Sequence, residues 1–330
     1  MEEEARISLR QTGNRVGGAL LIYMFIMTAS VVILIAFSVL LQMLEYLATY
    51  PGMTHIPNGI VDQIEPSATA FGNWGYLLAI AIGLTMLLLW KKPIYVRETI
   101  LAPGRKMERK DFILLTIVFF STQELYSWWY LLLEWAADWV GLSLSEIADR
   151  ALPGTDGAAM FLYACIFGPI AEEILFRGLI LRSMQPYGRK FAIIISSMLF
   201  GLFHGNIFQV PFAFFTGLVM GYVALEYHIG WAMALHLINN LLLADLIPGV
   251  LSLLPQGMDD LILTVFLLAC SVATVVILLI RRHDIRDEWH REPSVKGTYS
   301  AFFRAPAIIV FLVISAINIV SLPLLLLFMK

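Results

Sequence analysis

Nine stretches of this chain are each long and apolar enough to cross a lipid bilayer as a helix. The hydrocarbon core takes roughly 20 apolar helical residues, with about 17–25 as the usual range. The stretches are residues 16–44, 74–90, 112–133, 158–182, 190–208, 211–227, 230–247, 261–280 and 303–328. Backbone groups in lipid must be satisfied internally, so runs of this length are helices rather than barrel strands. The sequence predicts an all-α, polytopic transmembrane bundle of eight or nine helices, as a single membrane domain over residues 1–330.

The composition excludes several other classes of protein. Hydrophobic residues make up 59% of the chain and charged residues 14%, whereas a soluble domain typically has about 25% charged residues. The net charge of −3 gives no overall positive field for nucleic acid, so no nucleic-acid partner is expected. Cys165 and Cys270 both lie inside apolar stretches, which disfavours a disulfide framework or a thiolate metal cluster.

Lysine and arginine alternate between the two sides of the predicted bundle. Three arginines precede the first stretch, and residues 91–111 and 281–302 carry seven and five basic residues, whereas residues 45–73 and 245–260 carry none. Basic residues gather on the cytoplasmic side of membrane proteins. We therefore expect a multi-pass protein of the cell membrane with a cytoplasmic N-terminus. Topology alone explains these basic loops, without a ligand.

Charged and amide side chains interrupt three of the predicted helices. They are Glu172, Glu173, Arg177, His204, His236, Asn239 and Asn240. Each ionised side chain at the centre of a membrane helix costs roughly 2.5–3.5 kcal/mol on insertion scales. At about 1.5 Å of rise per residue, the three sets reach similar depths from helices of alternating direction. A shared depth predicts a polar cavity in the middle of the bilayer.

Spacing separates the two glutamates. Glu173 and Arg177 are four residues apart with the acid first, the favourable order for an ion pair on one helix face. The side chain of Glu172 is turned about 100° away from that face, so it does not take part in this ion pair and is available for another role. The same spacing puts His236 and Asn240 on one face, and it lets the ring of Phe200 wall the pocket beside His204.

These groups suit the hydrolysis of a peptide bond. A carboxylate and an imidazole can share a water molecule and raise its nucleophilicity by general base catalysis. A second histidine and an asparagine amide can donate hydrogen bonds to the developing oxyanion. Glu172, His204 and His236 could instead bind a catalytic zinc ion or another divalent metal. The sequence lacks HExxH, and we prefer a mechanism that requires no cofactor.

Three motifs resemble the hallmarks of one protease family. Residues 172–177 read EEILFR, similar to EExxxR; residues 200–204 read FGLFH, similar to FxxxH; and residues 236–240 read HLINN, similar to HxxxN. In this order on separate helices, they resemble the CPBP (CAAX protease and bacteriocin-processing, or Abi) family, which includes the type II CAAX prenyl endopeptidases. The resemblance covers roughly residues 112–247. That family is usually drawn with eight helices, so the stretch 303–328 departs from it.

The resemblance implies roles for individual residues. Glu172 and His204 activate the water, and His236 with Asn240 forms the oxyanion site. Two residues support the site: Glu173 and Arg177. The expected function is that of a hydrolase, an intramembrane endopeptidase that cuts a membrane-associated, lipidated or otherwise hydrophobic peptide substrate within the lipid bilayer.

Two other functions would also place these groups in a membrane. A proton-coupled transporter uses Glu and His at mid-membrane, although it more often shows broken helices in matching halves. A catalytically silent scaffold is the second alternative, against which the intact set of polar residues argues. Glu124 lies at a similar depth and is a further candidate for lining the cavity, whereas we expect Asn239 to bond a neighbouring helix.

The basic-residue pattern predicts the outcome of thiol labelling. Cysteines introduced into residues 91–111 should react with a membrane-impermeant reagent only from the cytoplasmic side, and those in residues 45–73 only from outside. Labelling in intact and opened cells distinguishes the two. Reaction of both segments from the same side would refute this topology.

Overall fold

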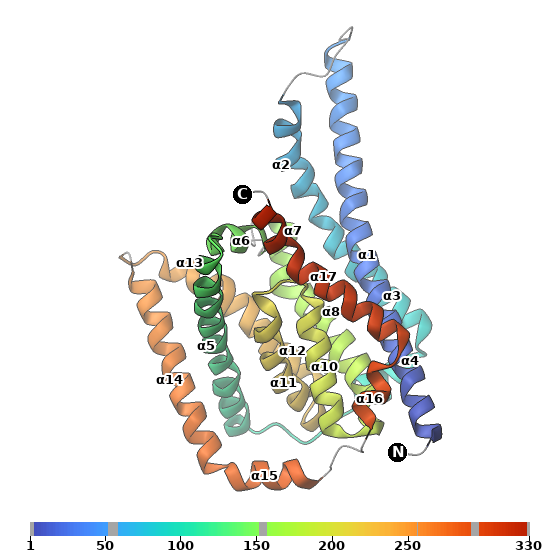
Figure 1. Cartoon of the computed structure of the whole chain (residues 1–330), viewed down its shortest axis with the longest axis vertical. Coiled ribbons are helices and arrows are strands. Elements are labelled where there is room, and N and C mark those ends of the chain that lie inside the picture. Colours follow the sequence, from blue (N-terminus) through green and yellow to red (C-terminus); the bar gives the residue numbers. More distant parts are fainter. Residues whose placement is uncertain (1–2, 52–58, 152–156, 256, 292–296, 329–330) are drawn as a thin grey trace.

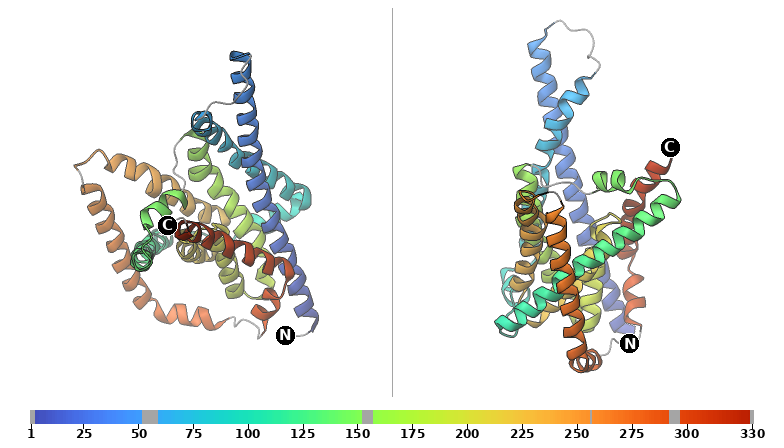
Figure 2. Two further views of the ribbon diagram at one scale, coloured as in Figure 1. Left: turned by 45° about the horizontal axis from the view of Figure 1, so that its top comes forward. Right: turned by 90° about the vertical axis from the view of Figure 1, so that its left-hand side faces the viewer.

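A computed structural model shows a bundle of helices (Figures 1 and 2). It describes residues 3–51, 59–151, 157–255, 257–291 and 297–328, and no strand occurs in these residues. Seven helical segments within them are long and apolar enough to cross a membrane. They are Glu3–Thr49, Gln63–Trp90, Ala158–Tyr187, Gln209–Glu226, Ile229–Leu251, Met258–Ile280 and Pro306–Leu325. The polytopic helical bundle expected from the sequence is confirmed.

The first helices reach beyond the expected spans. Helix α1 (Glu3–Thr49) has 47 residues and is roughly 70 Å long at 1.5 Å per residue, more than a bilayer requires. Helices α2 (Ile60–Gly72) and α3 (Trp74–Trp90) return along it, and the far part of this hairpin projects from the bundle (Figure 1). The expectation of a loop at residues 45–73 was therefore wrong for Ile60–Gly72, where helical pairing with α1 continues.

A short connection leads into a second long helix. It contains α4 (Pro93–Tyr95) and the π-helical turn η1 (Val96–Ile100). Helix α5 (Arg109–Trp139) follows and includes the expected stretch 112–133, and α6 (Leu144–Ala151) comes after it. Helix α5 packs against α11 and α14, so it forms one wall of the bundle.

The centre of the bundle alternates α-helical and π-helical turns. Its elements are α7 (Ala158–Phe161), η2 (Leu162–Phe167), α8 (Gly168–Glu173), η3 (Ile174–Leu181), α9 (Arg182–Met184), η4 (Gln185–Tyr187, a 3₁₀ turn), α10 (Arg189–Phe203), α11 (Gln209–Glu226), α12 (Ile229–Leu237), η5 (Ile238–Leu246) and α13 (Ile247–Leu251). Wide π turns inside α-helices occur frequently at functional sites. Here they adjoin the glutamates at the end of α8 and contain the asparagines of η5.

Helix α10 ends before the expected boundary at residue 208. Its 15 residues span only about 22 Å. His204 caps its end, and Gly205 has a φ of +64°, the left-handed conformation that glycine adopts without steric cost. The Gly205 N–H donates to the carbonyl of Leu202 at 3.2 Å, which closes the last turn. His204 therefore lies at the end of a helix and not within it.

The C-terminal helices form two separate groups. Helix α14 (Met258–Ile280) packs on α5, and α15 (Arg282–Arg291) lies across the lower end of the bundle in Figure 1. The expected stretch 303–328 is interrupted: α16 (Thr298–Phe303) stops before Pro306, which begins α17 (Pro306–Phe328). Proline has no N–H to donate and is favoured in the first turn of a helix, where that donor is unpaired in any case.

Two glycines allow α1 to pack closely on α17. A Cβ added to Gly17 would lie 2.6 Å from the carbonyl carbon of Ala307, and one added to Gly13 would lie 2.8 Å from the Cβ of Ala305. The side chain of Asn14 accepts a hydrogen bond from the Ala307 N–H at 3.2 Å. Small residues spaced four apart let helices approach closely in membranes. The two ends of the described chain are joined in this way.

We predict that Gly17→Ala destabilises the protein whereas Gly18→Ala does not. Both changes add the same methyl group to α1 and improve helix propensity by about 1 kcal/mol. Only the first meets backbone, because a Cβ at Gly18 has nothing within 4 Å. Overpacking typically costs about 1–3 kcal/mol. Melting temperatures in detergent would show the difference, and equal values would contradict this packing.

Candidate active site

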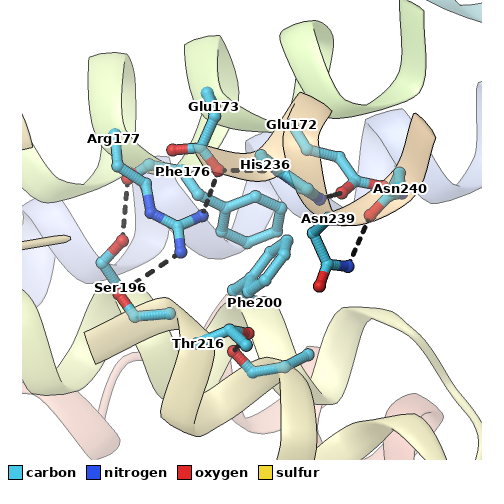
Figure 3. A network of polar contacts seen from close by, with 12 residues as sticks. Glu172, Glu173, Phe176, Arg177, Ser196, Phe200, Thr216, His236, Asn239 and Asn240 are labelled. Carbon is cyan, nitrogen blue, oxygen red and sulfur yellow. Dashed lines mark hydrogen bonds and ion pairs between the residues drawn. The ribbon is translucent and has the colours of Figure 1, made fainter. Parts of the chain in front are cut away.

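An ion pair is buried at the centre of the bundle. The guanidinium of Arg177 lies 3.1 Å from the carboxylate of Glu173, and both side chains are 0% exposed (Figure 3). Arg177 also stacks on the ring of Phe200 at 4.3 Å and donates to the carbonyl of Gly217 at 3.4 Å. The pair forms between residues four apart on one helix, as their spacing predicts.

His236 connects the ion pair to the second glutamate. Its Nδ1 lies 3.0 Å from Glu173 Oε1, and its Nε2 lies 3.7 Å from Glu172 Oε2 (Figure 3). An ionised carboxylate only accepts hydrogen bonds, so the His236 Nδ1–H donates to Glu173 and Nε2 faces Glu172. The sequence separated the two glutamates correctly by direction, but it did not foresee that His236 would contact both.

Glu172 is the more accessible of the two acids. Its side chain retains 17% of its exposure, whereas that of Glu173 retains none. The phenol groups of Tyr23 and Tyr163 lie close enough to the Glu172 carboxylate to interact with it electrostatically. Glu172 can therefore meet a substrate or a water molecule, while Glu173 is enclosed by protein.

His204 lies beyond the ring of Phe200. That ring makes edge-to-face contacts with both imidazoles, at centroid distances of 4.9 Å to His204 and 5.7 Å to His236. The Nδ1 of His204 lies 2.9 Å from the carbonyl of Phe200, which can accept its proton and leave Nε2 as an acceptor. Within the described residues, no hydrogen bond or ion pair joins His204 to Glu172. The two residues expected to activate water together are thus not directly bonded to each other.

Three amide side chains form a hydrogen-bonded chain beside the glutamates. Gln123 of α5 donates to the side-chain oxygen of Asn239, and Asn239 donates to Asn240 Oδ1 at 2.9 Å. Asn240 in turn donates to the carbonyl of Ala164 at 2.9 Å. The chain sets the orientation of the Asn240 amide and engages one of its two N–H groups, leaving the other for a ligand.

Helix α5 reaches the site through Gln123, a residue that sequence reasoning missed. Glu124 was the candidate on this helix, yet in the described part of the chain it forms no hydrogen bond or ion pair, whereas the preceding Gln123 bonds Asn239. Uncharged amides also bond across membrane helices, and that signal would have drawn attention to Gln123. Asn239 does bond a neighbouring helix, as expected.

An apolar cavity of about 460 Å³ opens between α1, α3 and the helical segment that carries Glu172, although Glu172 is not among the residues that line it. Its walls come from α1, α3 and the turns on either side of the glutamate, including Ala171, Ile174 and Leu175. Tyr23 lines it as well, and Asn14 and Arg15 are its polar residues. A cavity of this size and character can hold a hydrophobic chain.

The expected ligands for a metal ion are not gathered into one site. Glu172, His204 and His236 were the three candidates, and the described residues contain no group of three or more His, Cys, Asp or Glu side chains arranged to hold a metal. The arrangement of these side chains therefore does not fit the zinc alternative.

Removing one partner of the ion pair should destabilise the protein more than removing both. Glu173→Ala or Arg177→Ala leaves a buried charge without its partner, which costs about 3–5 kcal/mol. The double variant has no lone charge and should recover part of that loss. Melting temperatures of the four proteins measure this coupling. If the losses simply add, the pair is not coupled as its geometry indicates.

Comparisons with known proteins agree with these motifs. No curated protein and no solved structure matched the chain. Residues 154–242 match the family model described as type II CAAX prenyl endopeptidase Rce1-like. This segment contains the EExxxR, FxxxH and HxxxN motifs and the buried contacts of Figure 3. The chain is thus an integral membrane protein with an Rce1-like type II CAAX prenyl endopeptidase domain at residues 154–242, consistent with the CPBP family.

Proposed function

We propose that the protein is a glutamate-dependent intramembrane endopeptidase. The observation that carries the proposal is the pair of glutamates with opposite environments. Glu173 is enclosed by Arg177 and His236, whereas Glu172 remains partly exposed with His236 Nε2 at 3.7 Å. A fixed, charge-compensated partner beside an accessible carboxylate is the arrangement that a general base requires.

In this proposal Glu172 takes a proton from water while the hydroxide adds to the scissile carbonyl carbon. The Nε2 of His204 accepts the second hydrogen of the water and orients it, since its Nδ1 is engaged by Phe200. His236, when it carries a proton on Nε2 as well as on Nδ1, and the remaining N–H of Asn240 donate to the oxyanion. Glu172 then gives the proton to the leaving nitrogen as the C–N bond breaks, releasing a carboxylic acid and an amine.

The apolar cavity beside Glu172 supports a hydrophobic substrate. The cavity is lined by side chains of three membrane helices, and its polar residues Asn14 and Arg15 precede the long apolar part of α1. An apolar or lipid-modified peptide can therefore place its chain there, against Ala171 and Ile174, which lie on either side of Glu172 in the sequence. With a cytoplasmic N-terminus, as the basic segments predict, the peptide would enter from the cytoplasm.

Glu172→Gln should abolish peptide cleavage while the protein stays folded. The change keeps the volume of the side chain and removes the base. Glu124→Gln is the matched control, because it alters another intramembrane glutamate that lies outside the described contacts of the site. The measurement is a comparison of membrane-peptide C-termini in cells that express each variant, together with cleavage of a farnesylated CAAX-type peptide by purified protein.

The outcomes separate the alternatives. Normal cleavage by Glu172→Gln would exclude Glu172 as the base. If peptide termini in wild-type cells match those in the Glu172→Gln strain, the transporter or scaffold becomes the better account. Metal-stripped wild-type protein should keep its activity; loss that is restored by added zinc would overturn the proposed role of Glu172 as an unaided base.

A further inference from the structure

A second pocket lies at the end of the bundle where α1 begins. It has a volume of about 330 Å³ and is lined by the first turns of α1 and by residues of α16, with Gly297 at its edge. Three arginines line it together with one carboxylate: Arg6, Arg10, Arg304 and Glu3. They come from the two ends of the sequence and meet only because of the fold.

Among the described residues, the arginines of this pocket have no ion-pair partner, unlike other arginines of the protein. Arg105 and Arg189 both form ion pairs with Glu226. In the residues that the structure describes, none of the three pocket arginines has a carboxylate within ion-pair distance. Three guanidinium groups and one carboxylate give the lining of this pocket an excess of positive charge, which favours the binding of an anion.

The pocket is held in shape by the packing beneath it. Gly13 and Gly17 bring α1 against α16 and α17, and Asn14 bonds the backbone of Ala307. The side chain of Arg6 reaches across to α16, where its Nη2 lies 3.7 Å from the position of a Cβ on Gly297. This packing fixes the backbones that carry the three arginines, so the backbone needs little rearrangement when an anion binds.

Membrane topology explains how many basic residues this side carries, but not why they converge in one hollow. The pocket lies near the N-terminus of α1, before the apolar part of that helix, and α15 lies at the same end of the bundle (Figure 1). The apolar part of α1 begins at Val16, shortly after Arg10, so lipid headgroups would meet the protein at this end. Basic pockets at the ends of membrane helices bind phosphate-bearing headgroups.

We propose that Arg6, Arg10 and Arg304 bind the phosphate group of an anionic phospholipid. The planar guanidinium forks can donate paired hydrogen bonds to phosphate oxygens, and the hydroxyl of Ser300, which also lines the pocket, can donate another. The acyl chains would lie along the apolar surface of α1. This lipid would tie α1 to α16, and its binding does not depend on the peptidase function.

The test compares two charge-matched triple variants of the full-length protein in an uncharged detergent. Arg6→Gln/Arg10→Gln/Arg304→Gln removes the pocket, and Arg97→Gln/Arg109→Gln/Arg281→Gln removes three exposed arginines elsewhere. Native mass spectrometry measures the binding of dioleoylphosphatidylglycerol and of dioleoylphosphatidylcholine. An arginine near an anionic lipid contributes roughly 5-fold in affinity, so the pocket variant should bind phosphatidylglycerol on the order of 100-fold more weakly.

Retained preference for phosphatidylglycerol in the control, with loss in the pocket variant, supports the site. If both variants bind phosphatidylglycerol equally weakly, the proposed site is wrong, and the lipid is attracted by the positive charge of the protein surface in general. Displacement of the lipid by inorganic phosphate at equal concentration overturns the lipid assignment, because the site then takes free phosphate. Melting temperatures without lipid check folding, and the single variant Arg304→Gln should still weaken binding roughly 5-fold.

Discussion

The arrangement of the bundle centre depends on the charge of Arg177 being compensated where no water reaches it. A buried cation needs its carboxylate and its hydrogen bonds, so Glu173, the carbonyl of Gly217 and the ring of Phe200 must all lie around it. These partners belong to α8, α11 and α10. One guanidinium therefore fixes how three helices are rotated and how deep each of them sits relative to the others.

The proposed chemistry follows from that rotation. Glu173 is held by Arg177, and it holds His236 by Nδ1, so the imidazole of α12 can turn only its Nε2 toward Glu172. The neighbouring acid points elsewhere because adjacent helical residues are about 100° apart. Two consecutive glutamates thus acquire different environments without any difference in their own chemistry, the general way in which one residue type takes two roles.

Contacts within one helix were predictable from the sequence, whereas contacts between helices were not. The Glu173–Arg177 pair follows from a four-residue spacing inside one helix, and long apolar runs determine the all-helical bundle. The contact of His236 with Glu173, and that of Gln123 with Asn239, depends on which faces the helices turn to each other. The end of a helix was also not predicted where a single residue stops it. Gly205 stops α10 in this way, before the expected boundary at residue 208.

The close approach of α1 to α17 at Gly17 has a consequence for the order of assembly. Helix α1 is synthesised before α17, so the partner that its glycines fit is made only after the helices between them. Tyr23, about two turns beyond Gly17 on the same helix, lines the cavity beside Glu172. The wall of the cavity is therefore completed late in biogenesis. A chain that stopped before α17 would contain all three sequence motifs of the domain. It would still lack the contact between α1 and α17 that holds this wall of the cavity in place.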